Sequence, residues 1–431
     1  MKHLLERGGD ELKSFLSRHR VLFYNPMLVY MFMMVGIGLL GIHSAYPNAV
    51  SQYPQAGTFV FRQVLNFGVG FVALIAVLII GMERLRVLNW YLYGILMVLL
   101  AGLVGHRYGF PFIPFSHDAN GAARWYLFPG FTMQPSEFMR IILIFLVGDT
   151  IQKHNFIYPH VRRTSMSDLR LILKVMLIIG PPSAMIFVQP DSGITLLILI
   201  TTAIMLLVGG VQWRFILSVA GLTALAVGVF ISVAYYYPQF LVEYLGIEQY
   251  RVDRFTGWFN PFETISGVGR QLALGLVLIG SGGLFGHGLQ SAVTFVPEAH
   301  TDYIFSTIGS DFGFLGTMAI VIIYGLFCFE IINAAVLNRG HYNSFVCAGI
   351  FASIMGQLFW NIGMNIALLP ISGVTLPFIS YGGSSMLATM VMLGVVLSSY
   401  VEGAKIKHTD SNYRERILYL KTKAYLKEEK R

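Results

Sequence analysis

Ten long apolar stretches constrain this chain more than any other feature, because each approaches the length of a membrane-crossing helix. About 20 apolar residues in a helix cross roughly 30 Å of hydrocarbon. The stretches lie at residues 26–45, 58–80, 88–105, 137–152, 170–189, 192–210, 214–236, 303–327, 344–368 and 381–402. Hydrophobic residues make up 55% of the chain and charged residues only 12%, whereas soluble domains carry about a quarter charged residues. The sequence therefore predicts an all-α polytopic membrane protein with about ten transmembrane helices. One membrane domain, 26–402, would lie between a tail at 1–25 and a basic tail at 403–431.

Two of the stretches are irregular. The fourth is short and carries Arg140 and Asp149. The fifth contains Pro181-Pro182, and proline inside a helix removes a backbone hydrogen bond and clashes with the preceding turn. We expect the fifth helix to be kinked or broken there.

Basic residues predict the orientation, because Lys and Arg concentrate on the cytoplasmic side of membrane proteins. They concentrate in the two tails, in loops 81–87, 153–169 and 328–343 and at Arg214 in the turn between the sixth and seventh stretches, whereas loops 46–57 and 369–380 have none. Both termini are therefore expected in the cytoplasm, with the C-terminal tail forming a basic surface helix that anionic lipid attracts. The net charge of +8 reflects this asymmetry, so we expect no nucleic-acid partner.

The longest segment outside the predicted membrane helices, 237–302, lies between the seventh and eighth helices on the outer side. Its middle, 271–280, is apolar but too short to span, which favours a re-entrant or interfacial segment. Loops of this length are usually functional.

Polar clusters at the predicted outer side suggest both structural and functional roles. In the first cluster, Ser136 has the position of an N-cap, and Trp125 and Tyr126 resemble interface anchors. The functional alternative is that Arg124 meets an anionic lipid headgroup, since its planar fork donates two hydrogen bonds to phosphate. Asp191, in a short turn, either caps the sixth helix or has a functional role.

Two further clusters are rich in glycine. Residues 280–288 form either a turn or a phosphate cradle, but they lack the Gly-Lys-Ser/Thr ending of a Walker motif. Residues 369–385 hold two prolines and several hydroxyls, which predicts a rigid re-entrant loop acting as a lid, a pore lining or a headgroup contact.

The sequence 297–303 places three polar side chains at the outer start of the eighth helix. Asp302 has the position of an N-cap. Together with Glu298 and His300 it also has the composition of a general base or a divalent-cation site.

These motifs resemble those of the SEDS family (shape, elongation, division and sporulation), whose members include RodA and FtsW. The resemblance covers about 26–402 and is strongest in 121–137, 189–193, 280–288, 297–302 and 377–385. Residues 189–191, and 250–251 with 259–261, look more like RodA than FtsW. Departures from the family pattern include Ala123-Arg124, His287 and Ser310-Asp311.

The resemblance implies a peptidoglycan glycosyltransferase that joins lipid II, a disaccharide-pentapeptide on undecaprenyl pyrophosphate, into glycan strands. It implies a class B penicillin-binding protein as a crosslinking partner, contacts with other elongation or division proteins, and Asp302 as the catalytic residue. The expected cofactor is a divalent cation, Mg²⁺ or Mn²⁺, on Asp302 and Glu298, with no organic cofactor. The residues expected to bind substrate are Arg124, Trp125, Glu137, Asp191, Glu298, His300, Ser380, Ser384 and Ser385.

The predicted reaction takes place at the outer face of the bacterial cytoplasmic membrane and serves elongation and cell shape. Asp302 would remove the proton of an acceptor hydroxyl, and Arg124, other cations or a metal would neutralise the leaving pyrophosphate. Three alternatives remain: a division-specific FtsW-like polymerase, a lipid II flippase or transporter, and a scaffold for cell-wall enzymes. A transporter should place ionisable groups near the bilayer midplane, whereas here they lie mostly at the outer boundary.

Overall fold

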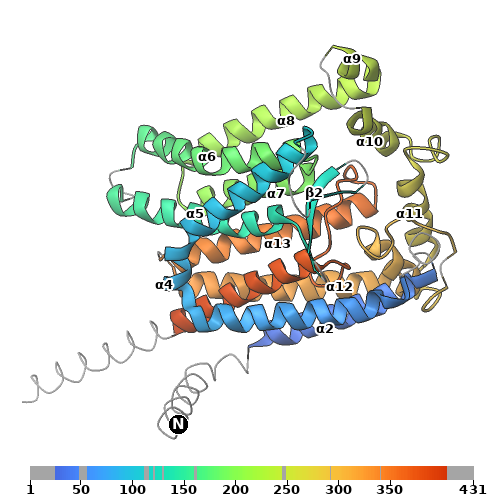
Figure 1. Ribbon diagram of the computed structural model, residues 1–431, viewed down its shortest axis with the longest axis horizontal. Helices are drawn as coiled ribbons and strands as arrows, with labels where there is room; N and C mark the ends of the chain where they lie inside the picture. Colours follow the sequence, from blue (N-terminus) through green and yellow to red (C-terminus); the bar gives the residue numbers. More distant parts are fainter. Residues whose placement is uncertain are drawn as a thin grey trace, which may run out of the picture.

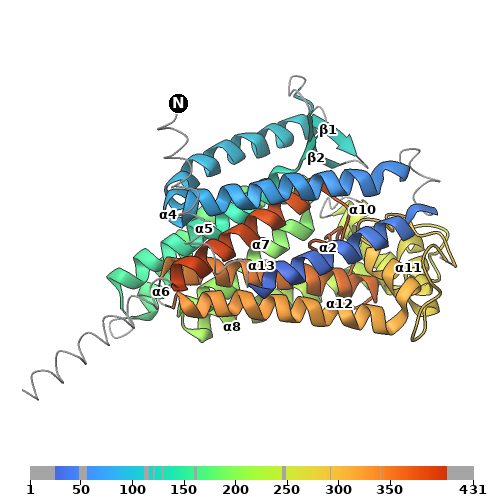
Figure 2. The ribbon, with the colours of Figure 1, turned by 90° about the horizontal axis from the view of Figure 1, so that it is seen from below.

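The computed structural model is a bundle of long helices with short elements gathered at one end (Figures 1 and 2). It describes residues 25–47, 56–110, 116–119, 122–128, 131–159, 163–244, 249–291, 293–339 and 341–404. Most of both predicted tails, 1–24 and 405–431, therefore lies outside the described residues. Seven of the described helices are long and apolar enough to cross a membrane, which confirms a multi-pass membrane protein.

The elements follow one another in a simple order. The helices are α2 (Pro26–Ser44), the short 3-10 turn η1 (Ala56–Thr58), α4 (Phe59–Arg107), α5 (Pro135–Ile157), α6 (Ser165–Val188), α7 (Ser192–Val208), α8 (Trp213–Tyr236), α9 (Pro238–Glu243), α10 (Gln249–Phe259), α11 (Arg270–Ser281), α12 (Ile304–Leu337), α13 (Tyr342–Asn365) and a last helix, Gly383–Ala404. Each predicted span corresponds to one of these helices or to half of α4.

The second and third predicted spans are joined within α4 without a separate loop. This element has 49 residues, about 75 Å at 1.5 Å per residue, which is far longer than a membrane is thick. Gly81 breaks it, with φ 75° and ψ 163°, a conformation that only glycine adopts at little cost. The predicted loop 81–87 is therefore a single-residue break followed directly by helix.

The expected break in the fifth predicted span is absent. α6 runs through Pro181 and Pro182 as one helix. Pro182 has no N–H to donate to the carbonyl of Ile178, four residues earlier. The Tyr93 hydroxyl donates to that carbonyl instead, at 3.0 Å, so a neighbouring helix satisfies one of the acceptors that the prolines release.

The fourth predicted span, α5, lies at the centre of the bundle and is buried along most of its length. Its charged residues are paired. The fully buried Arg140 donates to Glu137 at 2.9 Å, and Asp149 accepts from Arg86 and from Lys153, the latter at 2.6 Å. Paired charges explain how so polar a segment is accommodated among apolar helices.

A second break lies in α12, at Gly313 (φ 65°), and the glycine-rich segment 280–288 packs on it. The amides of His287 and Gly288 donate to the carbonyls of Ser310 and Asp311, at 2.9 and 3.0 Å. A Cβ at Gly286 would collide with the Asp311 carbonyl. Because these amides are used by backbone, the segment is a turn that fits the broken helix.

The predicted outer loop 237–302 contains three short helices, α9, α10 and α11. The short α11 corresponds to the apolar segment 271–280. It buries Leu278 against Val296, Ala299 and Tyr303. Figure 2 shows α10 and α11 at one end of the bundle.

The helical fold class is confirmed, but the sequence did not predict a small sheet. Strands β1 (Ser116–Ala119), β2 (Ala122–Phe128) and β3 (Phe131–Met133) form an antiparallel sheet in the order β1-β2-β3. Tyr126 on β2 is buried, and its hydroxyl donates to the Leu99 carbonyl at 2.8 Å. The prediction of Tyr126 as an interface anchor is therefore wrong.

Candidate functional site

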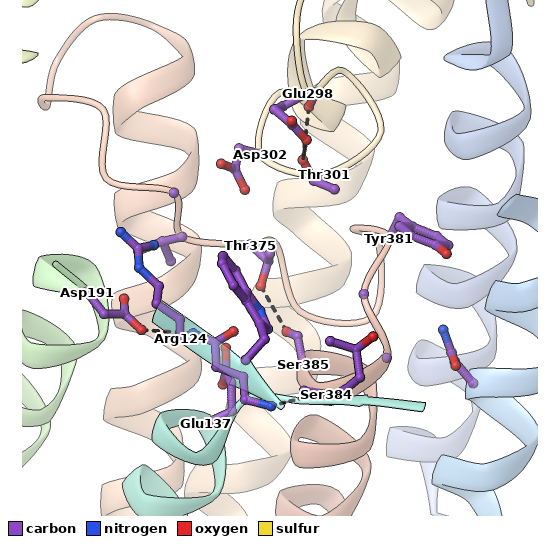
Figure 3. Close-up of a pocket in the computed structure, with 18 of the residues that line it drawn as sticks. Arg124, Glu137, Asp191, Glu298, Thr301, Asp302, Thr375, Tyr381, Ser384 and Ser385 are labelled. Atoms are coloured by element: carbon purple, nitrogen blue, oxygen red, sulfur yellow. Dashed lines mark hydrogen bonds between the residues drawn. The ribbon is translucent and has the colours of Figure 1, made fainter. Parts of the chain in front are cut away.

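A cavity of about 1290 Å³ lies where the sheet, the loop 369–385 and the ends of several helices meet. Figure 3 shows Glu298, Thr301 and Asp302 together on one side of it, with Arg124, Glu137 and Asp191 on another. Eight of the predicted site residues line it: Arg124, Trp125, Glu137, Asp191, Glu298, Asp302, Ser384 and Ser385. Two predicted residues, His300 and Ser380, do not.

Asp302 lies in the turn that precedes α12. Tyr303 is the N-cap of that helix, so the alternative that Asp302 caps it is wrong. Glu298 begins the turn with φ 56°, and its carbonyl accepts from the amides of Thr301 and Tyr303, both at 3.1 Å. Among the described residues, none donates a hydrogen bond to the Asp302 carboxylate, which remains available to a ligand in the cavity.

The charges around Asp302 set its protonation. Burial, reinforced by the negative charge of Glu298, raises the pKa of Asp302 to about 7, while Arg254 and Arg124 act in the opposite direction and Asp191 raises it further. A carboxyl group whose pKa lies near the working pH is both basic and available in its deprotonated form. This residue therefore has the properties of a general base.

Glu298 and His300 flank Asp302 but differ in position. Glu298 lines the cavity and accepts from the Thr301 hydroxyl at 2.9 Å. His300 is buried outside the cavity, stacked on Phe59 with ring centroids 4.7 Å apart. Burial lowers the pKa of His300, against the opposing effect of Glu298, so we interpret His300 as a neutral residue that packs behind the cavity.

Arg124 extends from β2 toward the turn before α7. It donates to the carbonyls of Gln189, at 3.2 Å, and Pro190. Its guanidinium also lies 5.8 Å from the centre of the Trp125 ring. These contacts hold the positively charged guanidinium of Arg124 at the edge of the cavity that Asp302 also lines.

The side chains of Asp191 and Ser136 form a hydrogen bond with each other, and neither side chain makes a capping bond to a helix backbone. The Asp191 carboxylate accepts from Gln134 Nε2 at 2.8 Å and from the Ser136 hydroxyl at 3.0 Å, and makes no capping bond to α7. Gln134, not Ser136, is the N-cap of α5. The expectation that Ser136 caps the fourth predicted helix is therefore wrong. Asp191 is the N-cap residue of α7, but its carboxylate makes no bond to the backbone of that helix and instead joins α5 to α7 at the cavity.

The serines of the loop 369–385 stabilise its shape. Ser380 donates to the Thr301 carbonyl at 2.7 Å and accepts from the Leu376 amide at 2.8 Å. Ser384 donates to the Thr132 carbonyl, and the hydroxyls of Ser385 and Thr375 lie 2.8 Å apart. These contacts make the loop 369–385 a folded wall of the cavity, and Ser380 supports that wall from behind.

Sequence reasoning missed several residues that line the cavity: Arg62, Asn66, Arg254, Gln271, Thr375 and Tyr381. An arginine near the start of an apolar span, as at Arg62, is a signal that could have been followed. The contribution of Arg254, on α10, depends on how the long loop folds, and the sequence does not show this.

Glu298 and Asp302 could supply two carboxylate ligands to a divalent cation. In the part of the chain that the structure describes, no group of three or more His, Cys, Asp or Glu residues could hold a metal ion. Mg²⁺ typically binds one or two carboxylates together with substrate phosphates and water. Glu298 and Asp302 are compatible with that mode, in which the substrate would supply the remaining ligands.

Fold and site together define a polytopic membrane protein with an acid–base cavity at one end of its bundle. A family model described as "Cell cycle protein", for FtsW, RodA and SpoVE, matches residues 25–403. The probable peptidoglycan glycosyltransferase FtsW of Thiomicrospira cyclica is 31% identical over 80% of this chain and 83% of its own length. That of Pasteurella multocida is 30% identical over 89% and 91%. The chain belongs to the FtsW/RodA/SpoVE family and is a membrane glycosyltransferase of that family.

Solved structures share the fold. A chain of a peptidoglycan synthase complex, studied for its coordination of polymerization and crosslinking, aligns with a TM-score of 0.68 and 22% identity over 88% of this chain and 97% of its own. RodA of Thermus thermophilus aligns with a TM-score of 0.59 and 24% identity over 87% and 95%. The curated relatives carry the name FtsW, so the names favour the FtsW branch over the RodA-like assignment expected from the sequence.

Proposed function

We propose that this protein polymerises lipid II into glycan strands at the outer face of the bacterial cytoplasmic membrane. The observation that carries the proposal is the Asp302 carboxylate, which accepts no hydrogen bond from the described residues, has a pKa of about 7 and lies in a cavity lined by arginines. A single base is sufficient for this chemistry because pyrophosphate leaves as an anion and needs no proton.

The proposed reaction is one displacement. The acceptor sugar hydroxyl attacks the anomeric carbon of the donor, a new glycosidic C–O bond forms, and the bond from that carbon to pyrophosphate breaks. Asp302 takes the hydroxyl proton, and undecaprenyl pyrophosphate leaves with the bonding electrons. Attack from the face opposite the leaving group inverts the anomeric centre.

The cations of the cavity are suited to the leaving group. Arg62, Arg124 and Arg254 all line it, and guanidinium groups bind phosphate oxygens through paired, charge-assisted hydrogen bonds. Their positive charge would stabilise the negative charge that develops as the pyrophosphate departs. If a divalent cation takes part, Glu298 and Asp302 would hold it, and it would supply further neutralisation of the pyrophosphate.

The orientation and partner belong to the same proposal. The cavity end would face outward and both termini the cytoplasm. The partner would be a class B penicillin-binding protein that crosslinks the new strands. The structural similarity to a chain of a complex that couples polymerization to crosslinking supports this pairing.

Fluorescent lipid II, incubated with the purified protein and its partner transpeptidase, tests the activity. We expect strands from the wild type and none from Asp302→Ala, in a complex that still forms. Glu263→Ala is the matched control, because Glu263 is an exposed carboxylate of the same loop that does not line the cavity. Normal strand synthesis by Asp302→Ala would refute the mechanism. Loss of activity with a chelator, restored by Mg²⁺, would support the cation, and full activity with chelator would exclude it.

For the cellular role, we propose division rather than elongation. The names of the curated relatives support division, whereas the elongation prediction rests on a few residues such as 189–191. Depletion in the native bacterium should give long filaments that fail to divide. Rounded, swollen cells would instead favour the elongation role.

A further inference from the structure

Two buried asparagines of α13 hold the backbone of Asp302. The Nδ2 groups of Asn361 and Asn365 each donate to the Asp302 carbonyl, both at 3.0 Å. Both side chains are fully buried and neither lines the cavity. A buried carboxamide is costly unless its hydrogen bonds are made, so two of them converging on one carbonyl indicate a specific use.

Asn365 is inserted into the first turn of α12. Its Oδ1 accepts from the amide of Ser306, at 3.3 Å, and from the Ser306 hydroxyl, at 2.7 Å. Ser306 lies four residues after Asp302, the spacing of one α-helical hydrogen bond. The next bond, from Thr307 to the Tyr303 carbonyl, is direct at 3.1 Å. Within the described backbone no bond joins the Ser306 amide to the Asp302 carbonyl, because the Asn365 carboxamide bridges the two groups.

Asn361 connects Asp302 to the facing loop. Its Nδ2 also donates to the Val374 carbonyl at 2.8 Å. Val374 follows Gly373, where a Cβ would lie 3.5 Å from Asp302 Oδ2. One amide group therefore fixes the distance between the Asp302 turn and the loop 369–385, which form adjoining walls of the cavity.

We propose that Asn361 and Asn365 are positioning residues that place the Asp302 carboxyl group against the acceptor hydroxyl. The proposal rests on the proposed function of Asp302 as the base. By replacing the first backbone hydrogen bond of α12, Asn365 keeps Asp302 outside the helix, and Asn361 sets how far its carboxyl group reaches into the cavity.

Alanine substitutions test this in the complex with the partner transpeptidase. In Asn365→Ala the Ser306 amide becomes free to bond the Asp302 carbonyl directly, which draws Asp302 toward the helix. Misplacing a catalytic group by about 1 Å costs on the order of 100-fold in rate. We therefore expect kcat to fall roughly 10- to 100-fold in Asn365→Ala and Asn361→Ala. The KM for lipid II should stay within about twofold, since neither side chain lines the cavity.

Asn338 supplies the matched control. It is equally buried and donates from Nδ2 to the carbonyls of Ala334 and Ser399, at 2.9 and 2.8 Å, but it lies at the opposite end of α12. Asn338→Ala should lower thermal stability while leaving kcat per folded complex unchanged. If the complex of either alanine variant does not form, Asn361→Ser and Asn365→Ser, which keep a buried hydroxyl, replace it.

The outcomes separate the two proposals. If Asn361→Ala and Asn365→Ala lose only stability, as expected for Asn338→Ala, or raise KM with kcat unchanged, the positioning role is refuted. If Asp302→Ala itself polymerises lipid II, the proposed function fails instead. A fall in kcat at constant KM, in folded complexes, supports the positioning role.

Discussion

At the scale of single residues, the charge environment of Asp302 makes its protonation the most accessible test of the site. A base must be deprotonated to act, and burial together with Glu298 raises the pKa of Asp302 to about 7. Polymerisation should therefore increase as pH rises through about 7 and level off above it. Activity that is flat between pH 5 and 8 would contradict this assignment.

Two substitutions should shift the rising limb of the pH–activity profile, where Asp302 loses its proton, in opposite directions. Glu298→Gln removes a negative charge that raises the pKa of Asp302, so the limb should move to lower pH. Arg254→Gln removes a positive charge that lowers this pKa, so the limb should move to higher pH. Profiles of kcat/KM against pH, at constant ionic strength and Mg²⁺ concentration, measure both shifts. Movement of both variants in the same direction would rule out a simple charge effect on Asp302.

At the scale of elements, the fit between the glycine-rich turn and the broken α12 makes a prediction about stability. Gly286 has φ 79°, and a Cβ there would strike the Asp311 carbonyl. Gly286→Ala therefore combines backbone strain with a steric clash and should cost at least about 2 kcal/mol. Gly325→Ala is the control on α12 itself, because a Cβ there meets nothing within 4 Å. Thermal unfolding of the detergent-solubilised protein should show a lower Tm for Gly286→Ala only.

The sequence predicts those helices whose apolar stretch is long enough to cross a membrane. The break at Gly81 falls where the loop 81–87 was predicted, but the break in α12 could not be placed, because proline was the expected signal inside a helix and glycine was the actual one. Pro181-Pro182 continues in helix where Tyr93 reaches a released carbonyl, whereas Gly313 adopts positive φ inside a predicted span that looks uninterrupted. The segment Ala122–Phe128 forms a strand because it pairs with Ser116–Ala119 and Phe131–Met133, and such pairing has little trace in local composition.

At the scale of the site, the sequence predicted which polar residues gather but not how they are held. Asp302, Glu298, Arg124 and Asp191 belong to motifs near predicted helix ends, so their convergence could be expected. The roles of Asn361 and Asn365 could not, because an asparagine in an apolar helix gives no indication of which carbonyl it will meet. Side-chain capping was overestimated at Ser136 and Asp191, since partners across the bundle compete with the local backbone for these side chains. Asp302 does not cap α12 because it lies one residue before the N-cap of that helix.

At the scale of the whole molecule, everything proposed for the cavity requires that its end of the bundle faces outward. The opposite end carries Arg86 with Asp149 and Lys153, and Arg163 with Asp168, which places the cationic loops there and predicts that this end is cytoplasmic. Ser291 is exposed beside the glycine-rich turn at the cavity end, and Ser165 is exposed at the start of α6 at the other end.

Cysteine labelling of intact cells decides the orientation. The native cysteines, Cys328 and Cys347, are both buried, so they should contribute little background. A membrane-impermeant maleimide should label Ser291→Cys in intact spheroplasts and should label Ser165→Cys only after the membrane is permeabilised. The reverse pattern would place Asp302 on the cytoplasmic side, where an outward-facing polymerase cannot act, and would remove the physical basis for the reaction proposed at that residue.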